Sequence, residues 1–241
     1  MDRIIMFDKN QANIGLSTRS TTPGTEYEMV SQFIEYYCDR FLRYNKSKNL
    51  AVFVEPRIVS GFPDIVFASF SPSITDNWTN ERNQLDTQDL KVLSHMLYSH
   101  TCSGSEIIGA LRLQEKQVLI SLEKLLDANL IIRRNKTWQP VAQSKIFSIQ
   151  KLLSVEAKIG NIKRVSEQSL INTWFASQSY ALTNSTTPTP STIESFQKYG
   201  IGLYCKEKGF KKIIEARQLP LPSSYLSLQF NEWIGKALQL A

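Results

Sequence analysis

The chain has 241 residues, of which 42% are hydrophobic and 21% charged, a balance typical of a soluble globular protein. No apolar run approaches the length that crosses a bilayer, and the opening residues lack the apolar core of a signal peptide, so we expect no membrane partner. The net charge of +6 favours a polyanionic partner such as nucleic acid.

The first part of the chain predicts one helix followed by two strands. Residues 1–24 end in the loop sequence STRSTTPG and predict irregular structure. In TEYEMVSQFIEYYCDRFLRYNK, large apolar residues recur at every fourth position, as on the buried face of a helix. Thr25 and Glu28 have the spacing of a capping box, which places the start of this helix. The apolar runs LAVFVEPRI and FPDIVFA predict two antiparallel strands.

Residues 83–142 predict a small helical domain inserted into an α/β core. They follow the polar linker SFSPSITDNWTNERNQ and contain three helical segments. Asn129 can adopt the left-handed conformation that ends the third helix. The runs LIIRR and TWQPV flank Asn135 and Lys136, which predicts a turn between two strands.

Strands and helices alternate again after this block. LLSVEAKI and QSYALT predict strands on either side of a helix over IKRVSEQSLINTWF. A short helix, two further strands and a closing helix, SYLSLQFNEWIGKALQL, complete the pattern. Residues 1–82 and 143–241 are therefore expected to form one discontinuous α/β core.

Two acids and a lysine suit phosphodiester chemistry. Asp64 follows Pro63 at the start of the second predicted strand, and Glu156 and Lys158 share one face of a later strand, about 6–7 Å apart. Carboxylates can hold Mg²⁺ or Mn²⁺, which polarises a phosphate, and a lysine can orient water or offset transition-state charge. The alternatives are a turn residue at Asp64 and a surface pair at Glu156 and Lys158.

The order Pro63-Asp64, then Glu156-Ala157-Lys158 in a strand followed by a helix, resembles the PD-(D/E)XK nuclease superfamily. The resemblance covers residues 25–68 and 150–215 and implies a restriction-endonuclease-like mixed sheet flanked by helices. It implies that Asp64 and Glu156 bind the metal ion and that Lys158 assists the attacking water. It also implies a glutamine near the scissile phosphate, which points to Gln168. A bacterial or phage setting in restriction, mobile elements or genome defence is implied by this resemblance alone.

Many members of that superfamily add a glutamate from the first helix, and helical phase here selects Glu26. At 100° per residue, Glu26 lies about 20° from Phe33, near the middle of the apolar face. Glu28 and Glu35 lie about 140° and 160° from Phe33. An acid that faces the core needs a partner or a metal ion, so we expect Glu26 to complete the metal site. The alternative is an acid that only favours the helix N-terminus.

The inserted block resembles a winged helix-turn-helix domain. SGSEIIGALRLQEKQVLISLEKLLDANLIIRRNKTWQP has a short helix, a turn, a second helix and a hairpin in the order of that family. The resemblance implies that the second of these helices reads base edges and that the hairpin contacts the DNA backbone. The candidate DNA-binding residues are Gln114, Lys116, Gln117 and Ser121 on the helix and Arg133, Arg134 and Lys136 in the wing. A winged helix that binds protein is the alternative.

Other classes of site lack support in the sequence. Cys38, Cys102 and Cys205 show neither a disulfide framework nor metal-site spacing, which fits a reducing cytoplasm. His95 and His100 have no neighbours at zinc-site spacing. There is no Gly-rich phosphate loop, which argues against NTP hydrolysis.

The sequence therefore predicts a metal-dependent DNA endonuclease with an inserted DNA-binding domain. A second hypothesis is a DNA-binding regulator that uses a catalytically silent nuclease-like scaffold. A third is a structural protein whose winged helix docks a partner. A homodimer and complexes with partner proteins both remain open.

Overall fold

The computed structural model describes residues 3–20 and 23–240 and divides into two compact units. The sheet unit comprises Met1–Pro72 and Ile149–Ser223, and the helical unit comprises Ser73–Ser148 and Ser224–Ala241. The sequence predicted an inserted domain over 83–142 and left the closing helix with the core. In the structure that helix belongs to the helical unit, because it packs against a helix of that unit.

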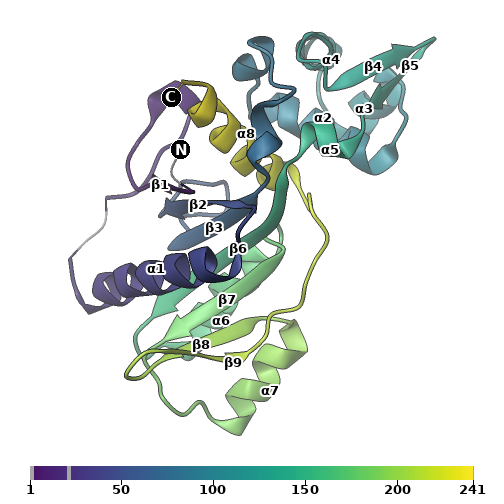
Figure 1. Cartoon of the computed structure of the whole chain (residues 1–241). Helices are drawn as coiled ribbons and strands as arrows, with labels where there is room; N and C mark the ends of the chain where they lie inside the picture. The colour runs from purple at the N-terminus through teal and green to yellow at the C-terminus, as the bar shows by residue number, and fades with distance from the viewer. Residues whose placement is uncertain (1–2, 21–22, 241) are drawn as a thin grey trace. The chain divides into compact units, whose positions relative to one another are not determined.

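The sheet unit is built on a mixed seven-stranded sheet (Figure 1). A mixed sheet flanked by helices was predicted, and the structure confirms it. The third strand in sheet order is antiparallel to both of its neighbours, and the next three strands are mutually parallel. In sheet order the strands are β1 (Ile4–Phe7), β2 (Asn49–Val54), β3 (Ile65–Phe70), β6 (Ile149–Lys158), β7 (Gln178–Thr183), β8 (Gly202–Lys206) and β9 (Phe210–Ile214).

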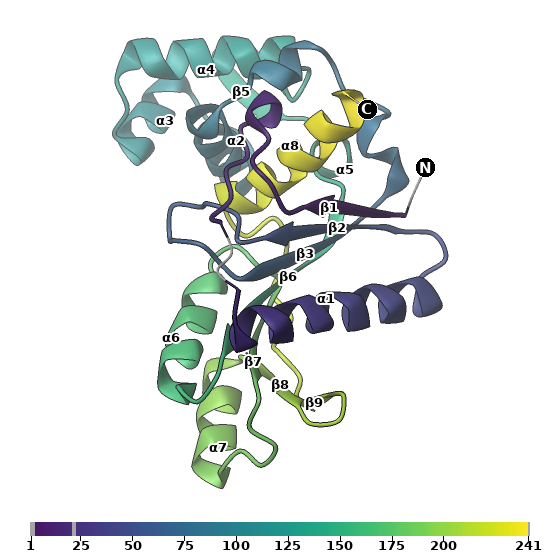
Figure 2. The same ribbon diagram turned by 90° about the vertical axis from the view of Figure 1, so that its left-hand side faces the viewer.

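Helices cover the two faces of this sheet (Figure 2). Alternate residues of the strands point to opposite faces of the sheet. Tyr180 and Leu182 belong to the hydrophobic core on one face, and Ala181 belongs to the core on the other face. Each apolar face of the sheet therefore has its own helical cover. The covering helices are α1 (Thr25–Tyr44) on one face and α6 (Ile162–Asn172) and α7 (Pro190–Tyr199) on the other.

The chain leaves the sheet and returns to it at neighbouring positions. Phe70 is the last residue of β3, and it pairs with Ile149, the first residue of β6. The segment between them therefore occupies the place of a hairpin loop. A long insertion costs little at such a point, because its two ends are already held together by the ladder.

The helical unit contains three helices followed by a two-stranded hairpin, as the sequence predicted. Asn129 and Asn135 both have positive φ, of 57° and 55°, at the predicted helix end and the predicted turn. A short helix and the closing helix complete the unit. Its elements are α2 (Thr87–Ser99), α3 (Gly104–Leu111), α4 (Glu115–Asp127), β4 (Ile131–Arg134), β5 (Thr137–Pro140), α5 (Gln143–Ile146) and α8 (Tyr225–Leu240).

A buried ion pair ties α8 into the helical unit. The Arg82 guanidinium donates to both carboxylate oxygens of Glu232, at 2.9 and 2.6 Å, and also to the carbonyl of Ile146. Its charge lies 4.1 Å from the centroid of the Trp78 ring. A Cβ at Gly235 would lie 2.0 Å from the same ring, so this tight contact requires glycine.

Two local predictions were wrong at the start of the chain. The irregular stretch contains β1, which pairs in parallel with β2. The capping box of Thr25 and Glu28 is absent: Gly24 is the N-cap and makes no side-chain cap bond, and Thr25 is already helical. The described residues also include three short 3-10 helices, at Ala12–Ile14, Pro72–Thr75 and Glu81–Gln84. Within the described ranges no helix combines the length and apolar character needed to span a membrane.

Candidate active site

Asp64 and Glu156 lie opposite each other at one end of the β3–β6 ladder. Ile65 pairs with Val155, and continuing this antiparallel register by one residue places Asp64 opposite Glu156. Facing residues of an antiparallel pair have Cβ atoms about 4.5–5.5 Å apart. Both side chains are buried, with exposed fractions of 7% for Asp64 and 3% for Glu156. The fold therefore brings together two acids that are 92 positions apart in the sequence.

The Glu156 carboxyl group is only half satisfied. Its Oε1 accepts a hydrogen bond of 2.7 Å from the amide Nδ2 of Asn172 on α6. Its Oε2 is buried and has no hydrogen-bond partner among the described residues. Burial, together with repulsion from Asp64, raises the pKa of Glu156 to about 8. A buried acid with a free oxygen and a raised pKa is typical of a functional site.

Asp64 is held by the backbone of the facing strand. Its Oδ2 accepts a hydrogen bond of 2.7 Å from the Ala157 amide, which fixes the carboxyl group against β6. Burial raises the pKa of Asp64 to about 6, although the Ala157 bond and the charge of Lys158 oppose the rise. Ionising either buried acid therefore costs free energy, and a cation bound between them would remove that cost.

Lys158 of β6 forms an ion pair with Glu26 of α1. Its ammonium donates to Glu26 Oε1, and this contact joins the end of β6 to the first turn of α1. Glu26 is less exposed than Glu28 and Glu35, in the order that helical phase predicted, but its side chain is still 41% exposed and does not face the core. The pair is not deeply buried, since the Lys158 side chain is 20% exposed. Ile159 follows the last residue of β6 and is exposed.

A hollow of about 340 Å³ opens beside these residues. Within it the Arg19 guanidinium forms an ion pair with Glu55, and its positive charge is also close enough to interact with Asp64 and Glu156. Arg19 could not be singled out from the sequence, because it lies in an irregular segment far from the motif. The lining residues are Arg19, Ser20, Glu26, Tyr27, Val30, Glu55 and Asp64.

Backbone strain also marks the edge of this hollow. Glu55 has φ of 45°, in the left-handed region that few residues other than glycine adopt. Its amide donates to the carbonyl of Asp64, so the strained residue is bonded to the start of β3. Strain of this kind persists only where the surrounding structure fixes it, and such positions gather at functional sites.

Gln168 lies one helical turn before Asn172 on α6. Positions four apart lie on the same side of a helix, so Gln168 lies on the side that carries Asn172 to Glu156. Its Oε1 is buried and has no hydrogen-bond partner in the described part of the chain. Asn172 was not among the predicted site residues, and the structure gives it the direct contact with an acid.

The three expected metal ligands do not form one cluster. Among residues 3–20 and 23–240 no three His, Cys, Asp or Glu side chains are arranged to hold a metal ion. Asp64 and Glu156 lie together, while Glu26 is turned to Lys158. Mg²⁺ is commonly held by one or two carboxylates and keeps several waters, so the facing pair is a sufficient protein contribution. The unpartnered Glu156 oxygen fits this role.

The predicted DNA-binding residues of the helical unit differ in how far they are exposed. Ser121 is fully buried and donates a hydrogen bond of 2.7 Å to Asp89, so it cannot reach a base from the surface. The Gln117 side chain accepts from the Gln114 amide, which closes the first turn of α4. Lys116 is exposed on the same helix.

The β4–β5 hairpin carries the exposed cations of the unit's predicted wing. Arg133, Arg134 and Lys136 are all exposed, and the hairpin pairs in antiparallel register. The Arg133 guanidinium lies 5.4 Å from the Trp138 ring centroid and donates to the carbonyl of Asn135. These contacts stiffen the hairpin and leave its positive charge in solvent.

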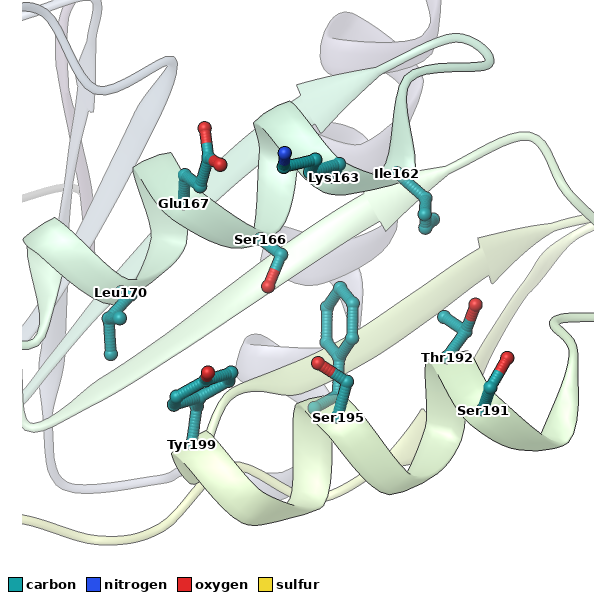
Figure 3. A pocket seen from close by; sticks show the side chains of 10 residues that line it. Ile162, Lys163, Ser166, Glu167, Leu170, Ser191, Thr192, Ser195 and Tyr199 are labelled. Atoms are coloured by element: carbon teal, nitrogen blue, oxygen red, sulfur yellow. The ribbon is translucent and has the colours of Figure 1, made fainter.

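A second hollow, of about 370 Å³, lies between α6 and α7 (Figure 3). Residues of both helices line it, and in Figure 3 Ser166 of α6 points toward Ser195 and Tyr199 of α7. Glu167 is the one acid among its lining residues, so it has no pair of carboxylates like that of Asp64 and Glu156. The sequence did not predict it.

Comparison with known proteins gives no assignment. No protein-family model, curated protein or solved structure matches the chain significantly.

Proposed function

We propose that this chain is a metal-dependent DNA endonuclease. The observation that carries the proposal is the pair of buried acids Asp64 and Glu156, which are close enough for Asp64 to repel Glu156, with Lys158 two residues beyond Glu156. This is the acid, acid and lysine set that the PD-(D/E)XK resemblance requires. The restriction-endonuclease-like fold and the winged helix belong to the same proposal.

The two acids would hold a Mg²⁺ or Mn²⁺ ion. Both groups have raised pKa values, Asp64 mainly because of burial and Glu156 because of burial and repulsion from Asp64, and a divalent cation reverses that preference. When bound, the cation supplies stabilisation of the negative charge that develops on a phosphate and favours ionisation of water. Asn172 holds one oxygen of Glu156 and leaves the other free to bind.

Lys158 orients the attacking water or offsets charge on the phosphate. Water supplies the oxygen that bonds to phosphorus and releases a proton, the ester P–O bond breaks, and the departing oxygen takes up a proton from solvent. Glu26 acts as a positioning residue, because its carboxylate holds the Lys158 ammonium at the end of β6. Its expected role as a third metal ligand is replaced by this contact.

Arg19 and the β4–β5 hairpin would contact the phosphate backbone. Arg19 lines the same hollow as Asp64, and a guanidinium can bind a phosphate through two hydrogen bonds. The hairpin supplies Arg133, Arg134 and Lys136 in solvent. The net charge of +6 suits a polyanionic substrate.

The test is cleavage of supercoiled plasmid in Mg²⁺ or Mn²⁺ by wild type and by Asp64→Asn and Glu156→Gln. Wild type should nick or linearise the plasmid, and each variant should be slower by about 100-fold or more, because each loses a ligand worth several kcal/mol. Glu35→Gln, on the exposed side of α1, should cleave at the wild-type rate. Calorimetric Mn²⁺ titration should show binding by wild type and by Glu35→Gln only.

The outcomes separate the competing functions. Plasmid that stays intact with wild type in both metals overturns the endonuclease. If the same protein binds DNA tightly, the sheet unit is a silent scaffold in a DNA-binding regulator. Cleavage that persists in Asp64→Asn would place the chemistry elsewhere.

A further inference from the structure

The outer face of α4 carries exposed apolar side chains beside charged ones, although the winged-helix resemblance makes α4 the DNA-reading helix. Leu119 is 51% exposed, Ile120 is 42% exposed and Leu126 is 38% exposed. The inner face is fully occupied, since Val118, Leu122 and Leu125 are buried in the unit's core. A helix with apolar residues on both faces needs a second surface to cover the outer one.

Two charges of opposite sign flank the exposed pair. Lys116 lies before Leu119, and Glu123 lies after Ile120, each three residues away. At 100° per residue, Lys116 and Glu123 lie within about 20° of each other, and Leu119 and Ile120 lie about 50° to either side of their midline. Both charged residues are exposed, and neither forms an ion pair within the described chain.

This face is complementary to itself. In an antiparallel pair of helices related by a two-fold axis, a residue before the axis meets its counterpart the same number of positions after it. With the axis between Leu119 and Ile120, Lys116 of one copy meets Glu123 of the other, and this contact occurs twice. Leu119 and Ile120 of the two copies pack between the charged contacts.

We propose that α4 is a homodimer interface, formed by antiparallel packing of this face on the same face of a second copy. The charge pattern favours a second copy over an unrelated partner, because a rotation about the two-fold axis places each charge opposite one of the other sign. The inference is independent of the nuclease proposal. It goes beyond that proposal by giving α4 a partner other than DNA.

One helix pair is a small interface, so the dimer should be weak and concentration-dependent. Stable interfaces bury about 800 Å² on each partner, which is more than one face of a four-turn helix offers. Sedimentation velocity over a micromolar concentration series should therefore show the mass rising from that of a 27.5 kDa monomer towards twice that value. A wild-type protein that stays monomeric throughout overturns the inference.

Charge reversal tests the register of the interface. Lys116→Glu and Glu123→Lys each place like charges together in the homodimer, so each should weaken dimerisation by about tenfold or more. In a mixture of the two single variants, every charged contact is again between opposite signs. The mixture should associate, and so should the double variant Lys116→Glu/Glu123→Lys.

Matched controls come from α7, where Glu194 and Lys198 are also exposed. Glu194→Lys and Lys198→Glu change the net charge by the same amounts and should dimerise like wild type. Circular dichroism melts check that each variant folds. Single α4 variants that dimerise like wild type, or a mixture that fails to associate, would overturn the proposed pairing.

Discussion

Asp64 lies opposite Glu156 where the β3–β6 ladder ends, and both carboxyl groups are buried. In the described chain neither carboxyl group forms an ion pair, and their side-chain hydrogen bonds come from the Ala157 amide and the Asn172 side chain. Two acids placed in this way destabilise the protein when both are ionised. The arrangement therefore has consequences for stability as well as for chemistry.

The metal-free protein should lose stability as the pH rises from about 4.5 to about 8. Unfolded Glu156 ionises near its ordinary pKa of 4.5, whereas folded Glu156 keeps its proton up to about 8. In this window the folded state binds more protons, so the free energy of unfolding falls with rising pH. Glu156→Gln removes this loss, and urea titration at pH 8 should show the variant more stable by a few kcal/mol, on the order of the pKa shift.

The same titration contains its own controls. Well below pH 4.5 the variant and wild type should be nearly equal, because Glu156 is then mostly protonated in both states. Glu35→Gln should show no such pH-dependent difference. Saturating Mg²⁺ should narrow the gap at pH 8, since a cation favours the ionised form. A gap that is independent of pH would mean that Glu156 is not the titrating group.

Removal of Lys158 and removal of its partner should have different kinetic effects. Lys158→Ala loses the group that assists the water, so the cleavage rate should fall by about 100-fold or more while Mn²⁺ binding remains. Glu26→Gln only loosens the lysine, so we expect a loss of about 10-fold, with Mn²⁺ affinity unchanged. Single-turnover cleavage and calorimetry measure both quantities. If Glu26→Gln abolished Mn²⁺ binding, Glu26 would be a metal ligand after all.

The β4–β5 hairpin should set the salt dependence of DNA binding. When glutamine replaces its three cations, the slope of log K against log salt should fall by about 1 for each phosphate that is no longer neutralised. Fluorescence anisotropy with a duplex oligonucleotide measures the slope. The matched control is the β8–β9 hairpin, where glutamine at three lysines should leave the slope unchanged. The residues replaced in the β4–β5 hairpin are Arg133, Arg134 and Lys136, and those replaced in the control are Lys206, Lys208 and Lys211.

The buried Arg82–Glu232 pair should matter far more than an exposed one. Glu232→Gln leaves a guanidinium that is 2% exposed without its counter-charge, which typically costs about 3–5 kcal/mol. Lys212→Gln breaks the exposed pair with Glu215 and should cost about 1 kcal/mol or less. Urea unfolding of both variants compares the two costs. Equal losses would mean that solvent reaches Arg82.

Much of the site followed from the sequence because its signals are local. Asp64 begins an apolar strand, Glu156 and Lys158 lie in another, and Glu26 could be placed by helical phase alone. The contact between Glu26 and Lys158 could not be predicted in that way. Whether Glu26 binds a metal ion or pairs with a lysine depends on how α1 and β6 approach each other in three dimensions.

The misses have physical causes. β1 is four residues long and depends on β2 for its hydrogen bonds, so its own sequence carries little signal. Ser121 is polar yet fully buried, because Asp89 accepts a hydrogen bond from its hydroxyl group and another from Lys124. The apolar pattern of the closing helix showed that it is buried but not which unit buries it. Such long-range pairings are absent from any local window of sequence.

The place where the chain leaves the sheet also sets the order in which the protein can be completed during synthesis. β3 emerges from the ribosome long before its neighbour β6, because residues 71–148 are made between them. The helical unit is completed later still, because Arg82 can form its ion pair with Glu232 only after α8 has been made. Each unit therefore remains incomplete while the other is being translated. Until Ile149 and the rest of β6 are made, the edge of β3 that ends at Phe70 has no strand to pair with.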